Sequence, residues 1–129
     1  MANLGQSCLF LDDSDERGGK FLSAFPAARW VRTVDDAIEH IRSGRYNEVF
    51  LDYDLLSDEK GVDFDDPSTG MAVVRWIVAN RPRLESVCIH SHNAPAASQM
   101  IIELKSAGYE AFYAPFGRSQ FWIKNRISQ

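Results

Sequence analysis

The feature that most constrains the fold of this chain is a short apolar run, Val49-Phe50-Leu51, which acidic side chains follow at once. A run of this length, bounded by polar residues, predicts a strand buried on both faces. Such strands occur in parallel sheets, where ligands bind beyond the carboxyl ends of the strands. We therefore expect Asp52 and Asp54 at that edge, with both carboxylates pointing the same way if the strand continues through Asp54.

Similar patterns along the chain predict further strands that alternate with helices. Strands are expected at 7–11, 28–32, 86–90 and 110–113, and helices at about 20–25, 33–44, 69–80 and 95–108. Residues 14–19 are polar and glycine-rich and are predicted to form a loop, whereas 119–127 is expected to form a short last helix. Strand–helix alternation indicates a parallel sheet with right-handed crossovers. Five such units fit an α/β flavodoxin-like doubly wound fold with strand order 2-1-3-4-5.

Length and composition limit the classes of protein to which this chain can belong. Its 129 residues suit one domain, expected to span 1–129, and the net charge of -4 argues against DNA readout. No run of about 20 apolar residues is present to span a membrane, and no signal peptide is recognised. Cys8 and Cys88 each lie in an apolar run, which predicts buried, reduced thiols in a cytoplasmic protein. The acidic loop 57–68 is unusually long for a connection, which hints at function.

Polar side chains follow three of the predicted strands: Asp12-Asp13 the first, Asp52 the third and 90–93 the fourth. The predicted strand order makes these strands neighbours, so their polar ends should meet in one cleft. Carboxylates that share a cleft repel one another, and a bound cation or protonation relieves the repulsion. Oxygen ligands suit a hard cation, so Asp12, Asp13 and Asp52 are predicted to bind Mg²⁺, or Mn²⁺ in its place. The bland alternative is that Asp12 and Asp13 are ordinary loop and cap residues.

The segment His90-Ser91-His92-Asn93 adds groups that can act on a phosphate ester. Imidazole titrates near neutral pH and can serve as acid or base, although packed or solvated histidines are a competing interpretation. If the strand runs through His92, both histidines share one face and Ser91 points the opposite way. A zinc site is a further alternative, for which His-x-His with distant carboxylates is a weak signature. Arg17 is either a bidentate phosphate clamp or a solvated surface residue.

From residue 7 to about residue 116 the chain resembles the receiver domain of response regulators. In that family an acidic pair after the first strand binds Mg²⁺, which corresponds to Asp12 and Asp13 here. The phosphoacceptor aspartate corresponds to Asp52, and the Ser or Thr after the fourth strand corresponds to Ser91. The family's Lys-Pro-Phe appears as 114–116, Ala-Pro-Phe, so the lysine that contacts the phosphoryl group is missing. The last helix is also expected to be shortened.

The chain is more similar to a divergent group, the cyclic-phosphate processing receiver domains. That group has Leu-Asp-Asp after the first strand with an arginine soon after, as in 11–13 with Arg17. It also has Leu-Asp-His/Tyr-Asp-Leu after the third strand and His-Ser-x-Asn after the fourth, as in 51–55 and 90–93. The resemblance implies a cyclic phosphate as substrate, either the 2′,3′-cyclic end of an RNA or a cyclic nucleotide.

Three functions follow as hypotheses. The first is metal-dependent hydrolysis of a cyclic phosphate: the metal ligands are those named above, Asp54 or His90 is the general base, and His92 or Asn93 supports the transferring group. Arg17 and Ser91 would bind the phosphate. The second is a degenerate receiver that acts as a signalling or interaction module, with Asp52 as phosphoacceptor. The third is a protein that sequesters a cyclic nucleotide without hydrolysing it.

Overall fold

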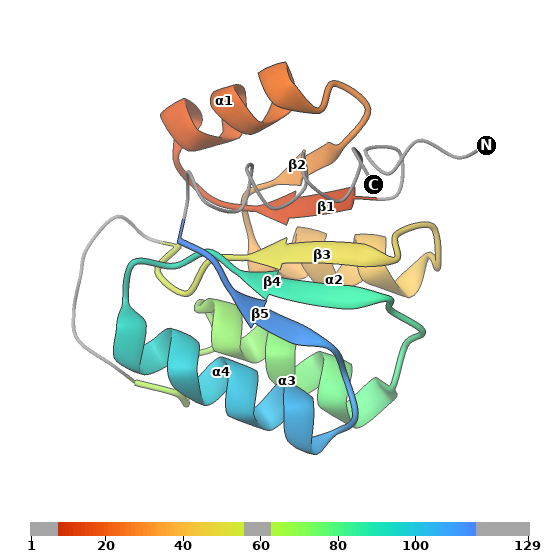
Figure 1. Cartoon of the computed structure of the whole chain (residues 1–129), viewed down its shortest axis with the longest axis vertical. Helices are drawn as coiled ribbons and strands as arrows, with labels where there is room; N and C mark the ends of the chain where they lie inside the picture. The colour runs from red at the N-terminus through yellow and green to blue at the C-terminus, as the bar shows by residue number, and fades with distance from the viewer. Residues whose placement is uncertain (1–7, 56–62, 116–129) are drawn as a thin grey trace.

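The computed structural model describes residues 8–55 and 63–115. Within these two segments strands and helices alternate, in the order β1 (Cys8–Leu11), α1 (Asp15–Ala24), β2 (Arg29–Val31), α2 (Val34–Arg42), β3 (Glu48–Leu51), α3 (Gly70–Asn80), β4 (Ser86–Ile89), α4 (Ala94–Ser106) and β5 (Ala111–Tyr113). All strand pairs are parallel, and the sheet has the order β2-β1-β3-β4-β5 (Figure 1). The predicted flavodoxin-like fold is confirmed, while the predicted helix 119–127 and residues 57–62 of the acidic loop lie outside the described residues.

The sheet is covered on both faces, which explains why its central strands are apolar throughout. Every residue of β1, β3 and β4 is buried. Alternate side chains point to opposite faces, one packed against α2, α3 and α4 and the other against α1. The smaller core on the α1 side contains Phe10, Phe21 and Phe50, together with Cys8 and Cys88, which are buried as predicted and form no disulfide among the residues described.

The first helix begins five residues earlier than predicted, so the expected loop at 14–19 is wrong. Ser14 is the N-cap, and its side chain accepts a hydrogen bond from the backbone N–H of Arg17 at 3.2 Å. Acidic residues in the first turn favour the positive end of the helix, and these terminal effects outweigh the low helix propensity of two glycines. Gly18 has a packing role, since a Cβ there would lie 2.1 Å from the ring of Trp30. Arg17 is therefore placed on the first turn of α1 rather than on a loop.

The ends of three neighbouring strands lie level with one another. Leu11, Leu51 and Ile89 are paired across β1, β3 and β4. The ladder continues one step further, because Asp52 N–H donates to the carbonyl of Leu11 and His90 N–H to that of Leu51. The strands end there, so neither β3 nor β4 extends far enough for the alternation that was considered for Asp54 and His92. This register places the side chains of residues 12, 52 and 90 next to one another.

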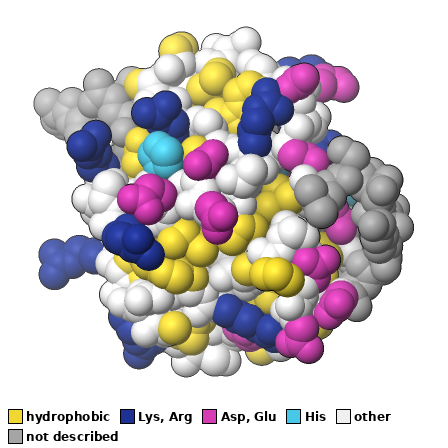
Figure 2. Space-filling model, turned by 180° about the vertical axis from the view of Figure 1, so that it is seen from behind, with side chains coloured by type: hydrophobic (Ala, Val, Ile, Leu, Met, Phe, Trp, Pro, Cys, Tyr) yellow, Lys and Arg dark blue, Asp and Glu magenta, His cyan; other side chains and the backbone are white. Residues whose placement is uncertain are grey.

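Figure 2 shows the molecule from behind the view of Figure 1, and on this face basic and acidic side chains are interspersed, with hydrophobic side chains between them. Among the residues that the structure describes, no helix has the length and apolar character that crossing a membrane requires.

Candidate functional site

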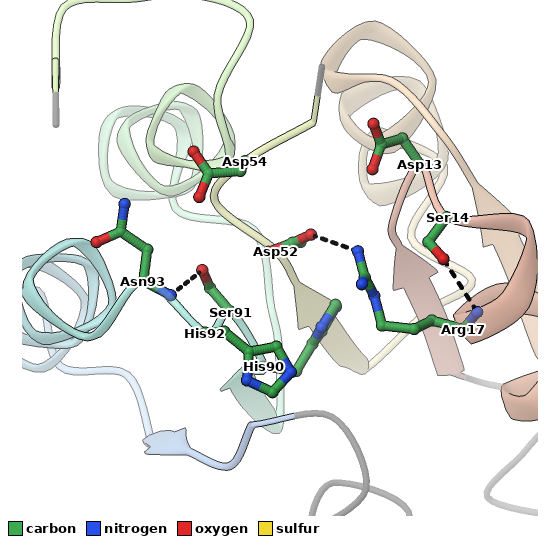
Figure 3. Close-up of a pocket in the computed structure, with 9 residues that line it drawn as sticks. All are labelled: Asp13, Ser14, Arg17, Asp52, Asp54, His90, Ser91, His92 and Asn93. Carbon is green, nitrogen blue, oxygen red and sulfur yellow. Dashed lines mark hydrogen bonds and ion pairs between the residues drawn. The ribbon is translucent and has the colours of Figure 1, made fainter. Parts of the chain in front are cut away.

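A cavity of about 360 Å³ opens at the carboxyl ends of β1, β3 and β4. It is lined by the side chains drawn in Figure 3, which are Asp13, Ser14, Arg17, Asp52, Asp54, His90, Ser91, His92 and Asn93. The structure thus brings together every candidate residue from the sequence, with Asp12 directly behind the lining. Asp54 and Asn93 lie on one side of the cavity in this view, and Asp13 and Arg17 lie on the other. The polar ends of the three strands meet in one cleft, as expected from the strand order.

Three carboxylates form a cluster that could hold a metal ion. One oxygen from each of Asp12, Asp13 and Asp52 lies within 4.8 Å of the others. Asp12 has no exposed surface and Asp52 is 5% exposed, so both would be costly to keep charged without a cationic partner. An all-oxygen donor set suits Mg²⁺ or Mn²⁺ better than Zn²⁺. The residues present therefore fit the metal that the sequence predicted.

Among the described residues that line the cavity, Arg17 carries the permanent positive charge. Its Nε and Nη2 donate to the two carboxylate oxygens of Asp12 at 2.7 and 2.9 Å. Its Nη2 also lies 3.6 Å from Oδ2 of Asp52, whose other oxygen accepts the backbone N–H of Tyr53 at 2.8 Å. Of the two sequence interpretations of Arg17, the structure therefore excludes the solvated surface residue.

His90 lines the inner wall of the cavity and is almost completely buried. Its ring stacks on Phe10 with the centroids 4.6 Å apart, and it is 1% exposed. Its Nε2 lies 3.0 Å from the carbonyl oxygen of Leu11; since a carbonyl only accepts, Nε2 carries the proton. Nδ1 then faces Oδ2 of Asp12 at 3.7 Å. Burial lowers the pKa of His90 to about 4, so the imidazole is neutral near pH 7.

The remaining wall of the cavity is formed by the segment before α4. Ser91 is buried, and its hydroxyl oxygen accepts the backbone N–H of Asn93 at 3.0 Å. The Asn93 side chain caps α4 by accepting the N–H of Ala96 at 3.3 Å, which leaves its amide N–H groups available to a ligand. His92 is exposed at the rim, and Asp54 is half-buried. Both of these titratable side chains can reach a bound molecule.

Three residues that support the site were not identified from the sequence. The Trp30 indole N–H donates to the backbone carbonyl of Asp12 at 2.8 Å. Tyr53 is buried, and its hydroxyl makes 2.9 Å hydrogen bonds with both the N–H and the carbonyl of Asp63. Gly70 lies so close to Asp52 that an added Cβ would be 1.8 Å from its carbonyl oxygen. These contacts fix the backbone on which the carboxylates are mounted.

The position of the family's missing lysine is also visible. Ala114 follows β5, and its N–H donates to the carbonyl of Ile89 at 2.9 Å, so the position that the lysine holds in the family lies beside β4 and carries a methyl group here. The adjoining Phe116 lies outside the described residues.

The buried state of Asp52 predicts a pH dependence of stability. Burial, assisted by the charge of Asp12, raises the pKa of Asp52 to about 7 from 3.8. The folded state therefore holds a proton that the unfolded state has lost, so ionisation of Asp52 destabilises the fold as pH rises from about 4 to about 7. His90 acts in the opposite direction, because its lowered pKa makes stability rise as pH increases from about 4 towards 6.5.

Comparing wild type with Asp52→Asn separates the pH dependence that Asp52 contributes from the one that His90 contributes. We expect the free energy of unfolding of Asp52→Asn, relative to wild type, to increase by roughly 2–4 kcal/mol between about pH 4 and pH 8. Urea denaturation at several pH values, without divalent metal, measures this difference. A difference that stays constant across the range would show that Asp52 ionises normally.

Comparisons with known proteins were made for the sequence and for the structure. The sequence model of the family described as "Cyclic-phosphate processing Receiver domain" matches residues 8–106. The structure is similar to the signal receiver domain of a protein described as the Luxo repressor of Vibrio parahaemolyticus, with a TM-score of 0.65, 21% identity, and coverage of 94% of this chain and 85% of that one. No curated protein matches the chain.

Two further solved structures share the fold. NtrX from Brucella abortus gives a TM-score of 0.65 and 21% identity over 92% of this chain and 26% of the NtrX chain. The BeF3-activated DrrB receiver domain gives a TM-score of 0.55 and 16% identity over 95% of this chain and 97% of that one. At these identities the likeness is one of fold.

Proposed function

We propose, from the premise that this chain belongs to the cyclic-phosphate processing receiver domains, that it hydrolyses a cyclic phosphate ester with the help of a divalent metal ion. The substrate class is the 2′,3′-cyclic end of an RNA or a cyclic nucleotide. The observation that carries the proposal is one cavity that joins a three-carboxylate cluster to a guanidinium and a further carboxylate, Asp54. Its volume of about 360 Å³ lies within the range of small-ligand sites.

Asp12, Asp13 and Asp52 would hold the metal. When bound, Mg²⁺ supplies neutralisation of the phosphate charge and Lewis acidity towards the attacking water. Arg17 and the amide of Asn93 orient the phosphate from opposite sides of the cavity.

We assign the proton transfers to the two reachable titratable groups. Asp54 accepts a proton from the attacking water while the water oxygen forms a bond to phosphorus. The ring P–O bond breaks, and the leaving alkoxide takes a proton from His92 at the rim, giving a phosphate monoester and a hydroxyl. His90 is less suited to the base role because its Nε2 is used by Leu11 and its Nδ1 faces Asp12. Its role in the proposal is to pack beside Asp12 as a neutral ring that closes the inner wall of the cavity.

Replacing the base should affect turnover far more than binding. For Asp54→Asn we expect kcat to fall about 10²- to 10⁴-fold, the contribution typical of a positioned general base, with Mg²⁺ affinity little changed. Steady-state hydrolysis of 2′,3′-cyclic AMP, 3′,5′-cyclic AMP and an RNA with a 2′,3′-cyclic end, followed by chromatography, measures the effect. Glu39→Gln, an exposed carboxylate on α2, is the matched control and should keep wild-type kcat. Wild-type protein that consumes none of these substrates with Mg²⁺ or Mn²⁺ would contradict the proposal.

A second candidate function, a receiver with Asp52 as phosphoacceptor, is favoured by the presence of Asp52 and Ser91 in the same cavity. Incubation with an acyl-phosphate donor distinguishes this function from hydrolysis. Formation of a single labile adduct that Asp52→Asn abolishes, while cyclic phosphates stay intact, would support the receiver function. Tight binding of a cyclic nucleotide that is recovered intact, with no adduct, would instead support sequestration.

A further inference from the structure

We propose that Arg17 and the metal ion exchange places: the guanidinium occupies the metal position in the metal-free protein, and metal entry releases it from Asp12 to bind the phosphate. This inference rests on the proposed function and adds to it how the site is regulated. It makes metal and phosphate binding mutually dependent through one side chain.

The first support is the coverage of Asp12 by Arg17. The Asp12 side chain has no exposed surface, whereas the Arg17 side chain that lies against it is 33% exposed. Oδ1 of Asp12 already accepts two hydrogen bonds, from Ser14 N–H at 2.9 Å and from Nη2 at 2.9 Å, and Oδ2 accepts Nε at 2.7 Å. A carboxylate oxygen has two acceptor sites, so Oδ1 is filled. A metal ion that binds Oδ1 has to replace one of these two donors, and Arg17 Nη2 is the one carried by a side chain that can turn away.

The second support is the position of Nη2 between two of the metal ligands. It lies 2.9 Å from Oδ1 of Asp12 and 3.6 Å from Oδ2 of Asp52. A Mg²⁺ ion that joined the same carboxylates would need oxygen distances of about 2.1 Å, and so would lie in the space that Nη2 holds. Two cations cannot share this space, for reasons of both size and charge.

The third support is that the Arg17 side chain has an alternative binding position in the cavity. Its backbone is held by the Ser14 cap, so the first turn of α1 stays fixed while the long side chain turns about its own bonds. The side chain lines the cavity, and a planar guanidinium suits bidentate binding of phosphate. The lysine that contacts the phosphoryl group in ordinary receivers is replaced by Ala114 here, and among the described residues that line the cavity Arg17 is the cation that can take over that contact. Because coupling is reciprocal, phosphate should tighten metal binding as much as metal tightens phosphate binding.

The Arg17 Nε–H resonance tests the exchange directly. In the metal-free protein we expect this group, held by Asp12, to be protected from solvent exchange in ¹⁵N NMR spectra, with Arg17→Lys identifying the signal. Adding MgCl₂ alone should shift the resonance and remove its protection, and inorganic phosphate should then restore protection at a new shift. Mg²⁺ binding by calorimetry with the Nε–H unchanged would mean that Asp13 and Asp52 hold the metal while Arg17 stays on Asp12, which overturns this inference alone. Absence of any Mg²⁺ binding overturns the inference and the proposed function together.

Substitutions provide an independent test. Arg17→Gln should tighten the Mg²⁺ Kd about tenfold, a typical coupling between sites. Because that variant leaves Asp12 buried without its cation, Arg17→Lys is the second variant. It keeps the positive charge but cannot bind both oxygens of Asp12 as the planar guanidinium does, and it should tighten the Mg²⁺ Kd about threefold. Lys20→Gln removes a cation one turn further along α1, which pairs with the exposed Glu16, and should leave Kd unchanged. Equal Kd values for Arg17→Lys and wild type would contradict the exchange, since simple charge repulsion predicts that result.

Discussion

Replacing Asp52 with Asn should weaken Mg²⁺ binding at least about 100-fold. The substitution replaces a charged carboxylate ligand with a neutral amide, and it leaves two carboxylates of the three in the cluster. Asp52 lies at the centre of the site, between Asp12 on β1 and the residues that follow β4. Its oxygen Oδ2 faces the cavity, while Oδ1 is held by Tyr53 N–H. Asparagine keeps the size of the side chain and can still accept that hydrogen bond, so the fold should be retained. Isothermal calorimetry with MgCl₂ measures the loss.

The control for this prediction is Asp54→Asn, two residues further along the same segment. It removes the same charge from the same cavity but not from the carboxylate cluster. We expect its Mg²⁺ affinity to stay within a few-fold of wild type. Equal losses in the two variants would mean that the cavity attracts cations only through its general negative charge, and the assignment of Asp52 as a ligand would fail.

Replacing Gly70 with Ala should destabilise the protein by about 3 kcal/mol or more, the upper part of the range for overpacking. A Cβ at this position would lie 1.8 Å from the carbonyl oxygen of Asp52 and 3.2 Å from the Met100 side chain. The Gly70 N–H donates to the carbonyl of Tyr53 at 2.9 Å, so helix α3 begins directly against the segment that carries Asp52. To make room, that segment or the start of α3 has to move. Urea denaturation measures the change in stability.

The same substitution at Gly19 is a matched control. Gly19 is exposed on helix α1, and an added Cβ would meet nothing within 4 Å. Alanine has the higher helix propensity, so Gly19→Ala should stabilise the protein by up to about 1 kcal/mol. If Gly70→Ala proved as well tolerated as Gly19→Ala, the close approach of α3 to Asp52 would be refuted. If it folds but loses Mg²⁺ affinity, the loss shows that the backbone of Asp52 must be held in place.

The sheet and the convergence of the site were predictable because they depend on short-range patterns. Runs such as 49–51 are apolar on both sides, as is typical of a covered parallel strand, and strand order then places residues 12, 52 and 90 side by side. The start of α1 was missed because Gly18 and Gly19 count against a helix, while the Ser14 cap and the acidic first turn count for it. The structure shows that the cap and the acidic first turn outweigh the two glycines, because α1 begins at Asp15.

The supporting contacts could not be predicted because they join residues distant in sequence. The Trp30 indole reaches the Asp12 carbonyl across β2 and β1, and Gly70 approaches Asp52 after a chain reversal. No periodicity or motif encodes either contact. The pairing of Arg17 with Asp12 is different, because the two residues are only five apart; it could not be predicted because it depends on α1 starting at Asp15.

The most direct test of the account is a ³¹P NMR time course of 2′,3′-cyclic AMP with wild-type protein and MgCl₂. The account predicts that the cyclic phosphate resonance disappears and a monoester resonance replaces it, with neither change in Asp52→Asn. A cyclic phosphate signal that persists, in this substrate and in an RNA with a 2′,3′-cyclic end and 3′,5′-cyclic AMP, would contradict hydrolysis as the function of this cavity.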